Sequence, residues 1–203
     1  ATDELKECIK LSNKKQASRF KYILAQVYQK VGNQKNAYEL FEDVIRESSD
    51  YEMTFNAKMN LAKSAIQTGI NVRKSKEALK KMLKDDKNKE YLDQIYFTIS
   101  EIDIAEMDTT ACINSLLNST KYSLENDVQK SLSFYNLAKI YYSKQEYRKA
   151  GLYYDSTILY IDKNDEKYAE IFETSQNLNK LITNLDVVYM QDSLIALSVL
   201  PKN

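Results

Sequence analysis

Apolar residues recur along most of the chain at spacings of three and four, which is typical of amphipathic helices that pack on one another. Four segments share a large apolar residue followed by a small one. The large residues are separated by 61−24 = 37, 99−61 = 38 and 137−99 = 38 positions, and they are Leu24, Leu61, Ile99 and Leu137. Self-similarity at a fixed period indicates repeats, so we expect a unit of about 38 residues.

A second apolar helix follows each of these segments after a polar turn, and it opens with a small residue. In three segments this residue lies 37−24 = 112−99 = 150−137 = 13 positions after the large one, as Ala37, Cys112 and Ala150. In the second segment Ala78 follows Leu61 by 78−61 = 17, so we expect an insertion of about one helical turn in the loop Thr68–Ser75. The pattern predicts an all-α fold of helix hairpins.

The ends of the chain extend this pattern. Leu5, Cys8 and Ile9 form a short amphipathic stripe that is typical of the second helix of a preceding repeat, and no initiator Met precedes Ala1, so we expect an excerpt of a longer protein. Apolar spacings of three and four return after Glu166 and predict a packing helix. The polar residues 191–193 interrupt its stripe and predict a bend or restart before Pro201.

This arrangement resembles the tetratricopeptide repeat, a pair of antiparallel helices about 34 residues long. The match is best in the first and fourth units, which contain Leu24, Ala25, Tyr28, Gly32, Ala37 and Phe41, and Phe134, Leu137, Ala138, Tyr141, Ala150 and Tyr154. The second and third units have Ala65 and Asp103 where the family has Tyr.

The resemblance implies a right-handed α-solenoid of such hairpins with a C-terminal capping helix. It assigns the whole chain, 1–203, to one domain. Its parts are the second helix of a truncated repeat (1–17), four repeats (18–50, 55–90, 91–127 and 128–162) and one or more C-terminal packing helices (166–200).

The amino-acid composition limits which catalytic and ligand-binding functions the chain can have. With 0 His and 2 Cys, histidine-dependent catalysis is excluded and the cysteines cannot complete a zinc site on their own, while 3 Gly and 1 Pro argue against an all-β fold. The 29 basic and 29 acidic residues give a formal net charge of zero, so the chain has no excess positive charge to attract nucleic acid. No apolar run approaches the roughly 20 residues of a membrane span. We expect no catalysis, cofactor, metal, nucleic acid or membrane span.

Three further motifs have structural interpretations. Cys112 takes a small-residue position, so we expect it to pack between helices, too far from Cys8 for a disulfide. The acidic stretch 162–166 lacks the Gly and Glu of a calcium loop and is interpreted as a helix boundary. The cationic run Arg73–Lys76 is interrupted by acidic residues further on, which favours a solvated helix face.

The resemblance also implies where a partner binds, because family members usually hold peptides or proteins along the first helix of each unit. Carried onto this sequence, those groove positions are Arg19, Tyr22, Gln26, Met59, Asn60, Lys63, Phe97, Glu101, Tyr135, Asn136 and Lys139. Asn60 with Lys63, and Asn136 with Lys139, share one helical phase, so their amides suit a peptide backbone and their ammonium groups a carboxylate. The alternative, that these are ordinary solvated residues, stays open.

A narrower resemblance rests on the segments Phe20–Gln29, Asp93–Phe97 and Gln191–Leu194. They are similar to the tetratricopeptide lipoproteins of Bacteroidota called PorW or SprE. This resemblance implies a periplasm-facing scaffold that is anchored to the outer membrane by a lipid upstream of this fragment and supports type IX secretion and gliding motility. The alternative is a cytoplasmic regulatory module that captures a short peptide in its concave groove. An enzyme is a third hypothesis, for which the sequence offers no nucleophile with an activating base.

Overall fold

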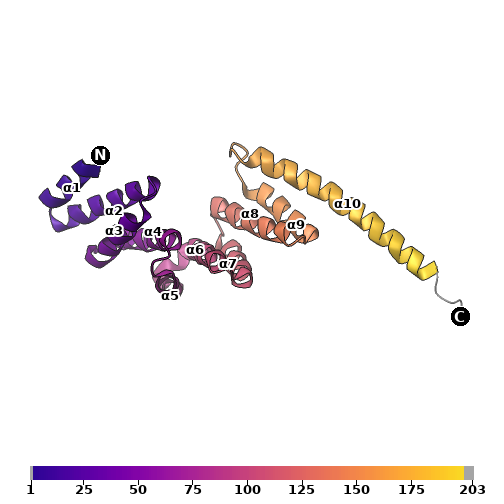
Figure 1. Ribbon diagram of the computed structural model, residues 1–203, viewed down its shortest axis with the longest axis horizontal. Helices are drawn as coiled ribbons and strands as arrows, with labels where there is room; N and C mark the ends of the chain where they lie inside the picture. Colours follow the sequence, from indigo (N-terminus) through magenta and orange to yellow (C-terminus); the bar gives the residue numbers. More distant parts are fainter. Residues whose placement is uncertain (1, 199–203) are drawn as a thin grey trace. The chain divides into compact units, whose positions relative to one another are not determined.

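The computed structural model of this chain describes residues 2–198, and that part of the chain is all-α, as predicted. Pro201 and the last two residues of the expected packing helix lie outside the described residues. One short 3-10 helix, η1, accompanies ten α helices (Figure 1). In chain order they are α1 (Thr2–Leu11), α2 (Lys14–Lys30), α3 (Gln34–Glu47), α4 (Tyr51–Thr68), α5 (Val72–Met82), η1 (Asp86–Tyr91), α6 (Leu92–Ala105), α7 (Thr109–Tyr122), α8 (Asp127–Ser143), α9 (Tyr147–Tyr160) and α10 (Tyr168–Ser198).

The described residues divide into two compact units, 2–118 and 119–198, and the boundary in the sequence falls inside α7. In the first unit every helix from α1 to α6 packs on the next one, and α4 also packs on both α2 and α6. The first helices of successive hairpins therefore lie side by side, which is the packing of an α-solenoid. In the second unit α8 and α9 form a hairpin, and α10 packs on α9. The handedness expected for the superhelix stays a prediction.

The first helix of each hairpin ends at a residue with positive φ. A left-handed residue ends the first helix eight positions after the repeated large apolar residue (32−24 = 69−61 = 107−99 = 145−137 = 8), and these residues are Gly32, Gly69, Met107 and Gln145, with φ of 81°, 71°, 60° and 60°. After three of them, the next N–H donates to a carbonyl five residues back at 2.8 to 2.9 Å, which closes a Schellman motif. Glycine occupies only two of the four positions, so the turn does not depend on glycine alone.

A small buried residue marks the crossing of the two helices in each hairpin. Ala37, Cys112 and Ala150 are buried there, as their positions predict. In the second hairpin the buried residue is Ser75, which is 4 % exposed, whereas Ala78 is partly exposed. The expected one-turn insertion is therefore wrong. Ser75 follows Leu61 by 75−61 = 14, and α5 begins three residues before Ser75 just as α3 begins three before Ala37, so one residue is inserted.

The third hairpin has a charged core. Asp103 holds the position of Tyr28 in the first hairpin and is 1 % exposed. Its carboxylate lies 2.7 Å from the Lys76 ammonium and accepts a hydrogen bond from the Ser115 hydroxyl at 2.7 Å. Burial lowers the pKa of Lys76, but hydrogen bonds to Asp103 and Glu106 outweigh burial and leave that pKa raised. Burial, and then the nearby carboxylates, raises the pKa of the buried Cys112 thiol to about 12.

The C-terminal helix α10 is one continuous helix of 31 residues (Figure 1). The bend or restart expected at residues 191–193 is wrong. Ser193 is exposed and its hydroxyl donates to the Tyr189 carbonyl at 2.8 Å, so its polarity is satisfied inside the helix. Near its start, Ile171 and Leu178 are buried, and a Cβ added at Gly151 of α9 would lie 2.8 Å from Ile182. The absence of a side chain at Gly151 thus lets α9 and α10 pack closely.

Candidate functional site

Three first helices of the first unit line a cavity of about 610 Å³, which we call the amide cavity. Side-chain amides provide most of its lining, and charged groups and one apolar residue complete it. The lining residues are Gln26, Gln29 and Lys30 of α2, Gln34 of α3, Asn60, Lys63, Ile66 and Gln67 of α4, and Glu101 of α6. Four residues that the sequence predicts for a partner-binding groove are among them: Gln26, Asn60, Lys63 and Glu101.

The repeat explains why side chains from three helices meet in this cavity. The position two residues after the large apolar residue of a repeat holds Gln26 in the first repeat, Lys63 in the second and Glu101 in the third (26−24 = 63−61 = 101−99 = 2). They therefore share one helical phase, and α4 packs on both α2 and α6. Residues of one phase on adjacent parallel-stacked helices face the same side, so the 38-residue period brings an amide, an ammonium group and a carboxylate together.

Tyr22 holds two of the cavity's amides in place. Its hydroxyl accepts hydrogen bonds from Gln26 Nε2 at 3.3 Å and from Asn60 Nδ2 at 3.4 Å, and its ring lies edge-on to Phe41 with centroids 5.9 Å apart. Burial raises the pKa of Tyr22, and the hydrogen bond with Asn60 lowers it in part. The predicted ligand residue Tyr22 thus links α2 to α4 and orients the side chains around it.

A second set of hydrogen bonds fixes the amides at the α2–α3 end of the cavity. Gln29 Nε2 donates to the backbone carbonyl of Asn60 and to Ser64 Oγ, both at 3.1 Å. Ser64 Oγ donates to Gln34 Oε1, and Gln34 Nε2 donates to the backbone carbonyl of Gln29, also at 3.1 Å. The sequence prediction missed Gln29, Gln34 and Gln67. Gln29 and Gln67 lie one turn beyond Gln26 and Lys63 (29−26 = 3, 67−63 = 4), so following the predicted face toward the helix C-termini finds both.

The charged side chains of the amide cavity are one partly buried carboxylate and two exposed ammonium groups. Glu101 is partly buried, and among the described residues its Oε2 atom has no hydrogen-bond partner. Burial raises the pKa of Glu101, and the charge of Lys63 lowers it in part. Lys30 and Lys63 are exposed. The cavity therefore offers an acceptor without a donor, flanked by groups that both donate and accept.

Three predicted groove residues of the first unit lie elsewhere. Met59 is 8 % exposed and packs in the core with Phe55 and with Ile95, Ile99 and Ile102 of α6, so its assignment to a partner-binding face is wrong. The packing of α6 on α4 covers this position. Phe97 is partly buried and does not line the amide cavity, and Arg19 lines a different cavity.

The three predicted groove residues of the second unit make local contacts. Asn136 Nδ2 donates to the Leu132 carbonyl at 2.8 Å, and Lys139 Nζ lies 4.8 Å from the centroid of the Tyr135 ring. That ring in turn lies edge-on to Tyr154, with centroids 6.2 Å apart. The pair Asn136 and Lys139 thus repeats the sequence pattern of Asn60 and Lys63 in a different environment.

Searches for related proteins identify a fold and no family. No family model matches the chain, and no curated protein matches it in sequence. The crystal structure of BtubC (BKLC) from P. vanneervenii is similar, with a TM-score of 0.70, 13 % sequence identity, and coverage of 100 % of this chain and 90 % of that chain. At this identity the likeness shows a shared fold. Within residues 2–198, no helix is both long and apolar enough to cross a bilayer.

Proposed function

We propose that this chain is a non-catalytic scaffold of the tetratricopeptide type that holds peptide segments of partner proteins, and that the amide cavity is one of its contact sites. The observation that carries the proposal is the lining of this cavity. Five side-chain amides line the same cavity as a partly buried carboxylate whose Oε2 has no hydrogen-bond donor among the described residues.

An extended peptide has the groups that match this lining. Each of its residues presents an N–H donor and a C=O acceptor, and a Gln or Asn amide can pair with both. A buried polar group without a partner costs about 1 to 3 kcal/mol. A peptide N–H or ammonium group that donates to Glu101 Oε2 removes that cost, so the unliganded chain favours a ligand with a donor at this point. Lys63 and Lys30 suit a carboxylate of the same peptide.

We further propose a cellular role in a cell-envelope secretion machine, as a PorW- or SprE-type lipoprotein that faces the periplasm and supports type IX secretion and gliding. The support for this role is the short-segment resemblance together with the repeated hairpins. The alternative is a cytoplasmic regulatory module that binds a short peptide in the same cavity. Labelling of the full-length protein in cells with a clickable palmitate analogue, followed by membrane fractionation, separates them. A lipid-modified protein in the outer-membrane fraction supports the first role, and an unmodified soluble protein supports the second.

Peptide display tests the binding proposal. Random peptides are selected on the immobilised 203-residue chain, and the enriched sequences are titrated by calorimetry against three proteins. These are the unaltered chain, the double variant Asn60→Ala/Lys63→Ala, and the matched control Asn136→Ala/Lys139→Ala. The control removes the same two residue types in the same helical phase from α8, outside the amide cavity. Circular dichroism establishes that both variants are folded.

We expect the Asn60→Ala/Lys63→Ala variant to lose at least tenfold in affinity, because two hydrogen-bonding groups, one of them charged, are removed. The control should stay within twofold of the unaltered chain. Equal affinity of all three proteins for every selected peptide would contradict the assignment of the amide cavity. Selection of no peptide by the folded chain would contradict peptide binding itself.

A further inference from the structure

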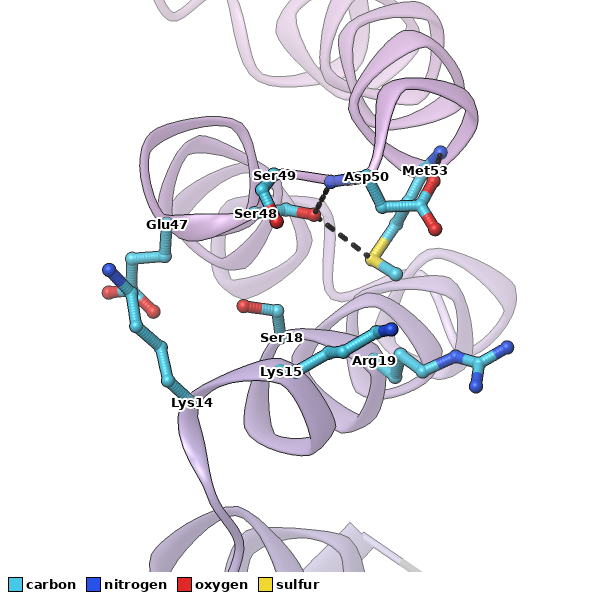
Figure 2. A pocket seen from close by; sticks show the side chains of 9 residues that line it. All are labelled: Lys14, Lys15, Ser18, Arg19, Glu47, Ser48, Ser49, Asp50 and Met53. Carbon is cyan, nitrogen blue, oxygen red and sulfur yellow. Dashed lines mark hydrogen bonds between the residues drawn. The ribbon is translucent and has the colours of Figure 1, made fainter.

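A second cavity, of about 380 Å³, lies at the start of α2, and we call it the cationic cavity. Figure 2 shows its lining, in which Lys14, Lys15 and Arg19 extend from the first turns of α2, Lys14 on the side of Glu47 and the other two on the opposite side. Serines 48 and 49 and the side chain of Met53 complete the opposite wall. No residue is shared with the amide cavity. The groove prediction reached this place only through Arg19.

Ser18 is the unusual residue of the cationic cavity. It is 2 % exposed, it lines the cavity, and its hydroxyl has no hydrogen-bond partner within residues 2–198. Figure 2 shows the hydroxyl between the two helical segments, directed away from α2 toward the α3–α4 connection. A serine inside a helix usually donates to the carbonyl four residues back, as Ser156 of α9 does to Leu152 at 2.7 Å. The Ser18 hydroxyl is therefore an unused donor that points into a cavity.

The charges around Ser18 favour an anion. Lys14, Lys15 and Arg19 are exposed and form no ion pair with any described residue. The two acidic residues of the lining are already engaged. Glu47 accepts from Lys21 Nζ at 2.7 Å, and Asp50 caps α4 by accepting from the Met53 N–H at 2.9 Å. Three cations that form no ion pair within residues 2–198 thus line the cavity into which the Ser18 hydroxyl points.

We infer that the cationic cavity is a binding site for an oxyanion carried on a peptide of a partner protein, as a phosphate ester or a carboxylate. The three cations and the Ser18 hydroxyl supply charge-assisted and neutral hydrogen bonds to the oxygens. The volume exceeds that of a single phosphate group, and the Met53 side chain provides an apolar surface for the methylene groups that carry the anion. This site is independent of the peptide contact proposed for the amide cavity.

Nuclear magnetic resonance of the full chain with small probes tests the inference. Three pentapeptide amides, acetyl-Gly-Gly-X-Gly-Gly with phosphoserine, aspartate or serine at X, and inorganic phosphate are titrated at low salt. We expect the phosphoserine or the aspartate peptide to shift the amides of residues 14–19 and 47–50, while the serine peptide does not. The tighter of the two anionic peptides identifies the source of the oxyanion. Absence of shifts at these amides with both, or binding no tighter than that of inorganic phosphate, would overturn the inference.

Variants distinguish specific binding in the cationic cavity from non-specific attraction of an anionic peptide to positive charge. Lys14→Ala/Lys15→Ala should lower the affinity for the tighter-binding peptide at least tenfold. Lys80→Ala/Lys81→Ala removes two exposed lysines that are consecutive in α5, outside this cavity, and should change the affinity less than twofold. Ser18→Ala should weaken binding about threefold without lowering the melting temperature, because it removes a buried hydroxyl that has no partner. Equal losses for both lysine pairs would overturn the inference. Asn60→Ala/Lys63→Ala should leave this binding unchanged, so the proposals for the two cavities are tested independently of each other.

Discussion

The first hairpin, α2–α3, and the third, α6–α7, have the same turn and the same helical phase but different cores. In the first, Ala37 and Phe41 are fully buried and Tyr28 packs against them. In the third, the position of Tyr28 holds Asp103, which is paired with Lys76. The helix crossing therefore needs a small residue and a defined turn, whereas the space beside it accepts rings or charges, provided that each buried charge has a partner.

The largest effect should come from breaking the charged core. Asp103→Ala leaves the Lys76 ammonium with Glu106 alone and removes the acceptor of Ser115, so we expect a loss of about 3 to 5 kcal/mol in the free energy of unfolding. Urea denaturation followed by circular dichroism measures it. Asp86→Ala, which breaks an exposed pair with Lys89, is the control and should cost less than about 0.5 kcal/mol. A loss from Asp103→Ala as small as the control's would contradict a stabilising role for the buried pair.

The thiol of Cys112 provides the second test of the third hairpin. Burial raises the pKa of Cys112 from 9.0 to about 12, and only the thiolate reacts with iodoacetamide. In a Cys8→Ser background at pH 8, we expect alkylation of the folded chain to be about a thousandfold slower than that of an ordinary thiol, because each pKa unit removes a factor of about ten in thiolate. Mass spectrometry follows the reaction, and urea should restore the ordinary rate. Fast labelling of the folded chain would show that the α6–α7 core is open.

The turns of the two hairpins can be exchanged. Gly32 and Met107 both have positive φ, and a Cβ added at Gly32 meets no atom within 4 Å, so only the backbone conformation opposes a side chain there. We expect Gly32→Ala to lower the free energy of unfolding by about 1 kcal/mol and Met107→Gly to raise it by up to about 1 kcal/mol. Thermal unfolding measures both. The same sign for both substitutions would contradict a shared turn geometry.

The smallest effect concerns position 101, which corresponds to Gln26 in the first hairpin. Burial raises the pKa of Glu101, although Lys63 lowers it in part. The folded state then holds the proton more tightly than the unfolded state, so the contribution of Glu101 to stability falls as the pH rises through its folded-state pKa. Glu101→Gln should therefore stabilise the chain by about 0.5 kcal/mol at pH 7 and by nothing below the ordinary pKa of a carboxyl group. Gln26→Glu, at an exposed position, should show no such pH dependence.

The repeat could be predicted because its signals are local or periodic. Leu24, Ile99 and Leu137 are buried at the expected spacing, and Ala37 lies at its helix crossing. The second hairpin was misplaced because Ala78 resembles the residues at the other crossings more than Ser75 does. Size, however, decides which residue fits a crossing, and the Ser75 side chain is small enough.

Of the eight groove residues predicted in the first unit, four line the amide cavity, and the positions of the other four depend on long-range packing. Gln26 and Lys63 follow from helical phase, but the burial of Met59 depends on α6, which is far away in sequence. The amide partners are also distant in sequence, as in the contact between Gln29 and Ser64, and no periodicity identifies them. The cationic cavity likewise joins residues 14–19 to residues 47–53, and its key residue is a serine that has no sequence signature.

Local pattern is sufficient to predict the helices, their period and the faces they present, because an apolar spacing of three to four residues and a polar turn act within a few residues of the chain. Which polar groups find a partner depends instead on tertiary packing. Within residues 2–198 the Oε2 atom of Glu101 and the Ser18 hydroxyl have no hydrogen-bond partner, although residues tens of positions away lie around them. Pairing across such separations is a property of packing rather than of local pattern.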